Sequence, residues 1–192
     1  MLAKIYDGKF DAKYLHDIFD ILQSKLNYKA CNVANVNTWP YGTEGSHRLF
    51  GSSIFRRNHP NIITYLDNDN APIFFELFEH LCKLLDLDSK SVYLDRIDVN
   101  LQHSGCDGTL HRDSNGPTDD SRYTIMVMPN PTWEKEWGGK FQIFSMDKTE
   151  ILEEYDYVPG RIIVFPSHYP HRGLGSTKEY LYRYSIVFGL IP

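Results

Sequence analysis

The chain has 192 residues, of which 42% are hydrophobic and 23% charged, and 20 Lys and Arg against 25 Asp and Glu give a net charge of −5. This composition is typical of a folded globular protein and excludes disordered and fibrous classes. The acidic excess argues against a large basic face for nucleic acid.

The three cysteines, Cys31, Cys82 and Cys106, share no CxxC spacing. An odd number without that spacing indicates neither a disulfide framework nor a thiolate zinc site. We therefore expect a reducing, cytoplasmic compartment. No apolar run approaches the ~18 residues that a membrane span needs, so we expect no membrane partner.

Two helices are predicted in the first half of the chain. Apolar residues recur at three- and four-residue steps over residues 11–26, which is typical of a helix that packs by one face. A second helix is predicted over 71–87. The segment between them, 31–70, is rich in Asn, Gly, Ser and Pro and predicts long loops with short strands. Candidate residues for a substrate cleft in this segment are Trp39, Tyr41, Arg48, Arg56 and Arg57.

After residue 89 the pattern changes to short runs of β-branched and aromatic residues separated by Gly, Pro and Asp. These runs predict strands at 92–103, 122–128, 139–144, 161–165 and 181–190. Strands at this density are typical of a β-sandwich or barrel. The chain is therefore predicted to be one mainly β domain braced by two helices.

His111 is the only one of the eight histidines with an aspartate, Asp113, two residues after it. In extended backbone such side chains point to the same side, so an imidazole and a carboxylate there can bind one cation together. Taken alone, such a pair is more often a solvated surface turn.

His171 follows the strand predicted over 161–165 and is a candidate third ligand. Two histidines and one carboxylate from distant strands form a facial triad, which holds Fe(II) and leaves positions open for other ligands and oxygen. A structural zinc site would close its fourth position with another protein ligand. His168 lies in the same loop and competes for this role. Cys106 is a weaker alternative, since an isolated thiol is usually a packing residue.

Arg183 lies near the start of the last predicted strand, with Ser185 and Val187 on its face and Tyr184 and Ile186 on the other. An arginine in an apolar strand is seldom buried unless it is paired, and its planar fork suits a carboxylate. The Ser185 hydroxyl could bind the same carboxylate. The alternative is an arginine that forms an ordinary salt bridge within the sheet.

The strand predicted over 92–103 alternates polar residues on one face: Arg96, Asp98, Asn100 and Gln102. The interior of a barrel near a metal site must be polar, so we interpret Asn100 and Gln102 as lining the site. An edge strand facing water would show the same pattern.

The order and spacing of these residues resemble the Fe(II)/2-oxoglutarate-dependent dioxygenases, and among them the prolyl 4-hydroxylase-like branch. The resemblance covers about residues 95–191. It rests on Gly105-Cys106-Asp107-Gly108-Thr109-Leu110-His111-Arg112-Asp113, Arg122-Tyr123-Thr124, Trp137-Gly138-Gly139-Lys140-Phe141, Pro159-Gly160-Arg161-Ile162-Ile163-Val164-Phe165-Pro166-Ser167 leading to His171, and Arg183-x-Ser185.

The resemblance implies a double-stranded β-helix, or jelly roll, with two bracing N-terminal helices. Residues 1–192 would form one dioxygenase domain, in which 1–88 give helical and loop support and 89–192 form the catalytic core. It also implies that His111, Asp113 and His171 are the catalytic metal ligands for Fe(II).

The resemblance further implies that Arg183 and Ser185 bind the far carboxylate of 2-oxoglutarate. Where prolyl hydroxylases often have a tyrosine nine residues before the first histidine ligand, this chain has Gln102. An amide can also donate to a carboxylate. Gln102 and Asn100 are therefore predicted as further cosubstrate contacts.

The implied activity is hydroxylation of an unactivated C–H bond with O2, with succinate and CO2 as coproducts and ascorbate as an accessory reductant. Peptidyl proline is the leading substrate, and a small molecule is an alternative. A nucleic-acid demethylase is a further alternative, but the net charge and Gly189, where alkylation-repair dioxygenases have a second arginine, argue against it. A cupin-like metal protein that uses no keto acid is the alternative from another class; it would not need Arg183.

Overall fold

The computed structural model describes residues 1–31, 49–59, 62–67, 69–88, 92–114 and 121–191. In chain order the elements are β1 (Lys4–Tyr6), α1 (Ala12–Ser24), β2 (Lys29–Cys31), β3 (Leu49–His59), β4 (Ile62–Tyr65), α2 (Ala71–Leu84), β5 (Tyr93–Gln102), β6 (Tyr123–Val127), a 3-10 turn (Lys135–Trp137), β7 (Phe141–Phe144), β8 (Ile151–Tyr155), β9 (Ile162–Pro166), β10 (His171–Gly173) and β11 (Arg183–Ile191).

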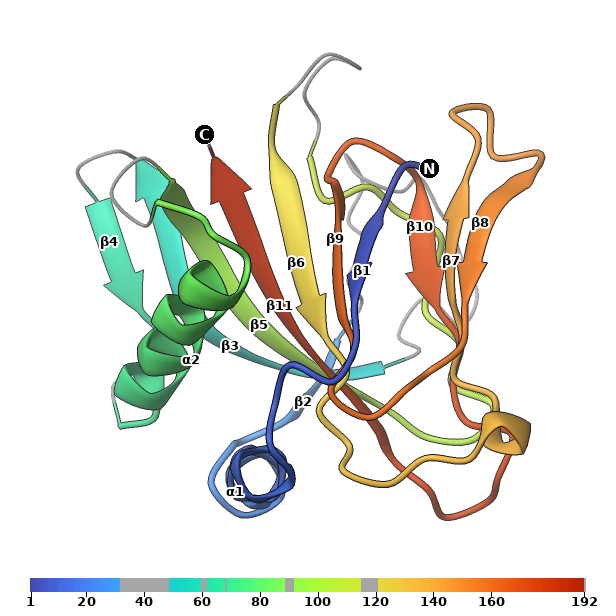
Figure 1. The fold of residues 1–192 in the computed structure, drawn as a ribbon, viewed down its shortest axis with the longest axis horizontal. Helices are drawn as coiled ribbons and strands as arrows, with labels where there is room; N and C mark the ends of the chain where they lie inside the picture. The colour runs from blue at the N-terminus through green and yellow to red at the C-terminus, as the bar shows by residue number, and fades with distance from the viewer. Residues whose placement is uncertain (32–48, 60–61, 68, 89–91, 115–120, 192) are drawn as a thin grey trace.

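Two antiparallel sheets form the β core. The large sheet has the strand order β1-β9-β6-β11-β5-β3-β2, with β4 paired to β3, and the small sheet has the order β10-β7-β8. Figure 1 shows the large sheet curving across the molecule with the small sheet on the right. This mainly β architecture with two helices is that of the predicted jelly roll.

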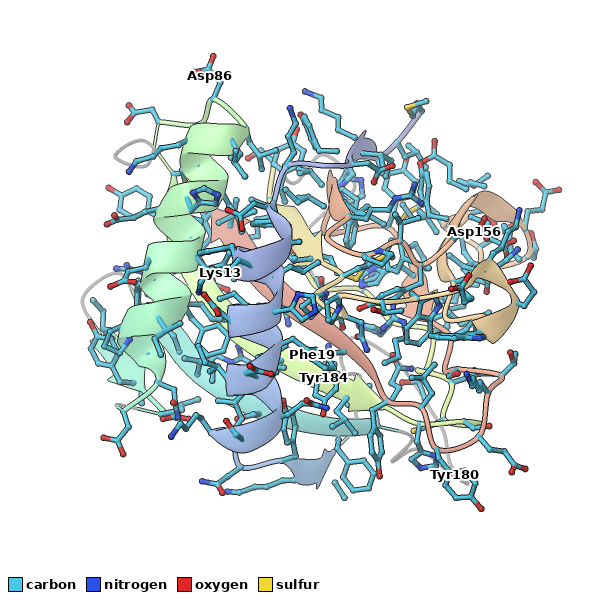
Figure 2. The ribbon with its side chains drawn as sticks, turned by 60° about the horizontal axis from the view of Figure 1, so that its bottom comes forward. Lys13, Phe19, Asp86, Asp156, Tyr180 and Tyr184 are labelled. Atoms are coloured by element: carbon cyan, nitrogen blue, oxygen red, sulfur yellow. The ribbon has the colours of Figure 1, made fainter. Side chains whose placement is uncertain are left out.

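Both helices cover the outer face of the large sheet. In Figure 2 α1 and α2 run side by side over its strands, and the ring of Phe19 on α1 meets that of Tyr184 on β11 at 5.4 Å. Tyr14 on α1 contacts His80 on α2, with ring centroids 5.2 Å apart. None of the helices in the described ranges is long and apolar enough to cross a membrane.

Strand alternation separates an apolar core from a polar interior. On β5, Ile97 and Val99 are fully buried in the core under the helices, while Asp98 and Asn100 face the space between the sheets. This follows from the period of two along a strand. The four polar residues that alternate along this strand, Arg96, Asp98, Asn100 and Gln102, all border that space.

The first half of the chain contributes more to the sheet than its composition suggests. The helices lie close to their predicted positions, and Asp11 caps α1 by accepting from the backbone N–H of Tyr14 at 2.8 Å. The prediction of long loops over 31–70 is wrong for 49–59, because β3 is eleven residues long and pairs with β5. Its glycine, serines and charged residues have a loop-like composition, but pairing with a neighbouring strand determines its conformation.

Candidate active site

A cavity of about 940 Å³ lies between the two sheets. Its lining comes from both halves of the chain, with β3 and β5 on one side and β10 on the other. The members that the sequence singled out are Arg56, Arg96, Asp98, Asn100, Gln102, His111, Asp113, His171, Arg183 and Ser185. The seven residues predicted to bind the metal or the cosubstrate therefore border one space.

His111, Asp113 and His171 converge at one end of this cavity. One ligand atom from each lies within 4.8 Å of the other two, an arrangement that could hold a metal ion. The Nε2 atoms of His111 and His171 are 3.6 and 3.5 Å from the Asp113 carboxylate oxygens. Two nitrogens and one oxygen on one side of a metal are the donor set of a facial triad.

The backbone fixes both histidines in the orientation that a metal needs. His111 and His171 form an isolated antiparallel bridge, in which their N–H groups donate to each other's carbonyl oxygens at 3.1 and 2.8 Å. Each ring places Nδ1 2.8 Å from the carbonyl oxygen two residues earlier, on Thr109 and Tyr169. A carbonyl only accepts, so Nδ1 carries the proton and Nε2 presents a lone pair.

Electrostatics keep these ligands in their metal-binding forms. Burial alone would raise the pKa of the Asp113 carboxyl, but Arg96 and the two histidines hold it well below its usual range. Burial lowers the pKa of His171 to about 4, so its imidazole is neutral at pH 7. An ionised carboxylate and a neutral imidazole are the states in which these side chains bind metals.

Arg183 is a buried cation whose partners leave one nitrogen unused. Its Nε donates to the Gly139 carbonyl at 3.0 Å and its Nη1 to Gln102 Oε1 at 2.8 Å. Its Nη2 has no hydrogen-bond partner within the described part of the chain, although the side chain is only 1% exposed. Burial lowers its pKa to about 10, so it remains charged at neutral pH.

The surroundings of Arg183 are neutral. No carboxylate of the residues that the structure describes pairs with it, and it lies 5.2 Å from the centre of the Tyr157 ring. A Cβ on Gly173 would lie only 3.1 Å from both terminal nitrogens, so a larger residue here would press against the guanidinium. A buried cation without an acid is costly unless an anion joins it, and the free Nη2 shows where one fits.

Gln102 contacts Arg183 and two backbone carbonyls. Both hydrogens of its amide are used, because Nε2 donates to the carbonyl oxygens of Cys106 and Gly173 at 2.8 and 2.9 Å. The sequence assigned this amide to the cosubstrate, whereas its oxygen accepts from Arg183. Asn100 pairs in register with Ser185, and both border the cavity beside Arg183.

Of the residues that the structure describes, the remaining candidates lie outside the metal-binding group. His168 is buried against Tyr169, with ring centroids 4.7 Å apart, and is not part of the metal-binding group. Cys106 is also buried and outside that group. Arg56 borders the cavity, whereas Arg57 donates to the Leu94 carbonyl. Trp39, Tyr41 and Arg48 lie outside the described residues.

Comparison with known families agrees with this geometry. The model of the 2OG-Fe(II) oxygenase superfamily matches residues 98–188, which include the triad and Arg183. The chain belongs to this superfamily. It is an enzyme of the oxygenase family, with the Fe(II)-binding triad and the use of 2-oxoglutarate that are typical of that family. No curated protein sequence matches it.

Solved structures share the fold at low sequence identity. A 2OG-Fe(II) oxygenase-family oxidoreductase from Burkholderia pseudomallei is 14% identical with a TM-score of 0.72, covering 99% of this chain and 85% of its own. A prolyl hydroxylase from Trichoplax adhaerens, in complex with a peptide fragment of the hypoxia inducible factor oxygen degradation domain, is 16% identical with a TM-score of 0.63 (99% and 83% covered). HygX from Streptomyces hygroscopicus, with nickel and 2-oxoglutarate bound, is 11% identical with a TM-score of 0.62 (100% and 83%).

Sequence reasoning did not find the residues that hold Asp113. Thr124 Oγ1 donates to Asp113 Oδ2 at 2.7 Å, and Arg96 forms an ion pair with Oδ1. Arg96 was noted only as a member of a polar face. The sequence does place an arginine on the same strand face as three polar cavity residues, which indicates that it borders the cavity. Its partner, Asp113, lies in a loop whose path the pattern does not predict.

Proposed function

We propose that the protein is an Fe(II)- and 2-oxoglutarate-dependent hydroxylase of an unactivated C–H bond, with succinate and CO2 as coproducts. His111, Asp113 and His171 would hold the iron, which together with O2 and the keto acid supplies the oxidation chemistry. The chain itself provides the ligands, the orientation of the cosubstrate and a cavity between the sheets.

The single observation that carries the proposal is Arg183. It is a buried, charged guanidinium without an acid among the described residues, it has one unused nitrogen, and it borders the same cavity as the triad. A dicarboxylate that reaches from the metal to Arg183 would supply the missing negative charge. A metal site alone would not need this cation.

The neighbours of Arg183 would contribute to 2-oxoglutarate binding in different ways. Gln102 would orient the guanidinium through Nη1, so that Nη2 points at the carboxylate. Ser185 and Asn100 would donate to the cosubstrate from the next row of side chains, where they face each other across β11 and β5.

Peptidyl proline is the proposed substrate. Support comes from the sequence resemblance and from the prolyl hydroxylases among the structural neighbours, including one in complex with a peptide. Since one fold hosts many functions, the choice of substrate is tested directly.

One observation favours a second candidate, a small polar molecule. Besides the triad and Arg183, the cavity is bordered by Lys29 and Asp67, and by the Arg56–Asp98 ion pair. Charged side chains of both signs suit a hydrophilic substrate that matches them one by one.

The experiment measures succinate release with Fe(II), 2-oxoglutarate and ascorbate, first with proline-containing peptides and then with polar small molecules. Peptide-dependent succinate and a mass gain of one oxygen on proline would support peptidyl proline. Stimulation only by a small molecule would select the second candidate. No 2-oxoglutarate turnover above that of the H171A variant with any substrate would contradict the oxygenase activity.

We also propose that residues 1–192 act as one catalytic domain with its core in 89–192. Support comes from β1 and β3, which lie before residue 89 and join the large sheet. We propose a cytoplasmic location as well, in keeping with the buried thiol of Cys82, which forms no disulfide.

A further inference from the structure

The metal ligand Asp113 is held at both of its carboxylate oxygens. Arg96, which reaches across from β5, forms an ion pair through Nη2 with Oδ1. Thr124 Oγ1 donates to Oδ2 at 2.7 Å, and the backbone N–H of Asp113 donates to the Ser167 carbonyl at 2.9 Å. The side chain therefore has one set position before any metal arrives.

Arg96 is itself fixed by a chain of alternating charges. Its Nη1 lies 3.3 Å from Asp98 Oδ2. Arg56 binds the same Asp98 through two nitrogens, each 2.7 Å from a carboxylate oxygen. The Ser53 hydroxyl donates to Asp98 Oδ1 at 2.8 Å. A bidentate arginine–carboxylate pair has a defined geometry. Asp98 is thus a fixed support for Arg96.

Gly189 provides the space that Arg96 occupies. The two residues are register partners on β11 and β5. A Cβ on Gly189 would lie 2.7 Å from Cγ and 2.9 Å from Nε of Arg96, closer than side-chain atoms can approach. The backbone at Gly189 does not have a positive φ, so the requirement for glycine here comes from space and not from conformation.

We propose that Arg96 is a positioning residue for the metal ligand Asp113. We further infer that position 189 is glycine because the Arg96 side chain must pass over β11 there to reach Asp113. This rests on the proposed function, in which Asp113 binds Fe(II). Outer-shell partners of a metal-binding carboxylate orient it, and their loss typically weakens metal binding about 10–100-fold.

The charge of Arg96 acts in the opposite direction. A guanidinium that shares a carboxylate with a divalent cation repels that cation, so charge alone predicts tighter metal binding when Arg96 is neutralised. The two effects differ in sign. Metal affinity therefore separates a positioning role from a simple charge effect.

The test is anaerobic Co(II) binding followed by visible absorption, in wild type and in R96M, R96K and G189A. We expect R96M and G189A to bind Co(II) about 10–100-fold more weakly and to give an altered spectrum at saturation. Lysine keeps the charge but cannot span Asp98 and Asp113, so R96K is also expected to bind more weakly than wild type. R57M is the matched control, because Arg57 lies on the same sheet, contacts Leu94 and should leave affinity unchanged.

The role of Arg96 is overturned if R96M binds Co(II) as tightly as wild type or more tightly, or if R96K has both the affinity and the spectrum of wild type. Should R96M not fold, G189A decides, because it displaces an intact Arg96. In a double-mutant cycle, G189A should add little to R96M, since both act through one side chain. Wild type that binds no Co(II) would instead contradict the metal site and, with it, the proposed function.

Discussion

The orientation of the Gln102 side chain determines which of its atoms contact Arg183 and which contact the backbone. Its amide joins two backbone carbonyls to Arg183. Strand alternation in the sequence led to the interpretation that Gln102 lines the site, and in the structure it borders the cavity opposite Arg183, its register partner on β11. The sequence could not show that both amide hydrogens are used on carbonyls in a loop distant in sequence.

Replacing Gln102 with glutamate should weaken 2-oxoglutarate binding. A carboxylate at this position would neutralise Arg183 and repel the incoming dicarboxylate. A repulsion over ~5 Å at an effective dielectric constant of ~20 amounts to about 3 kcal/mol, or roughly a 100-fold loss of affinity. Titration of 2-oxoglutarate into Co(II)-loaded protein measures this loss, and Q23E on the exposed face of α1 is the charge control. Unchanged affinity in Q102E would show that Arg183 does not bind the cosubstrate.

Among the elements, the positions of buried strands along the chain were easier to predict than the pairing of strands within the sheets. The apolar runs that form β6, β9 and β11 are buried on both faces, and such runs are recognisable from composition. β8 was missed because Ile151–Tyr155 carries two glutamates and lies at the edge of the small sheet. An edge strand has one partner and is free to be polar, so its pattern resembles that of a loop.

β8 also ties the start of the chain to the small sheet. Glu153 accepts from the backbone N–H groups of Leu2 and Ala3 at 2.6 and 3.0 Å, and from the Tyr155 hydroxyl at 2.6 Å. Burial would raise the pKa of Glu153, but these three donors lower it overall. Its ionised form is therefore favoured by folding.

E153Q should lower the unfolding free energy at pH 7 by about 1–3 kcal/mol. Because the pKa is lower in the folded state, this contribution is complete above the unfolded value of about 4.3 and disappears as the pH falls through the folded value. Urea unfolding of wild type and E153Q at pH 7, 5 and 4 measures the difference, with exposed Glu150 replaced by Gln as control. A difference that grows as the pH falls would contradict this account.

For the whole molecule, the cavity between the sheets couples ligand binding to folding. The triad comes from a loop and from β10 in the small sheet, while Arg183 lies on β11 in the large sheet. Metal and 2-oxoglutarate together would therefore bridge the two sheets. At 100 times the dissociation constant, a ligand that binds only the folded state stabilises it by about 2.7 kcal/mol.

For a chain of this size, that stabilisation should raise the midpoint of thermal unfolding by about 5–10 °C. Thermal scans with Ni(II) and 2-oxoglutarate, alone and together, measure this effect. H171A should lose the metal-dependent part of the rise. An equal rise in H171A would place metal binding elsewhere on the protein.

The most direct test of the central claim is anaerobic addition of Fe(II) and then 2-oxoglutarate to the apoprotein, with H111A as control. A keto acid chelated to iron gives a visible charge-transfer band. The proposed site predicts this band in wild type and its loss in H111A. Bound iron without the band in wild type, or an equal band in H111A, would contradict a 2-oxoglutarate-dependent oxygenase site at His111, Asp113 and His171.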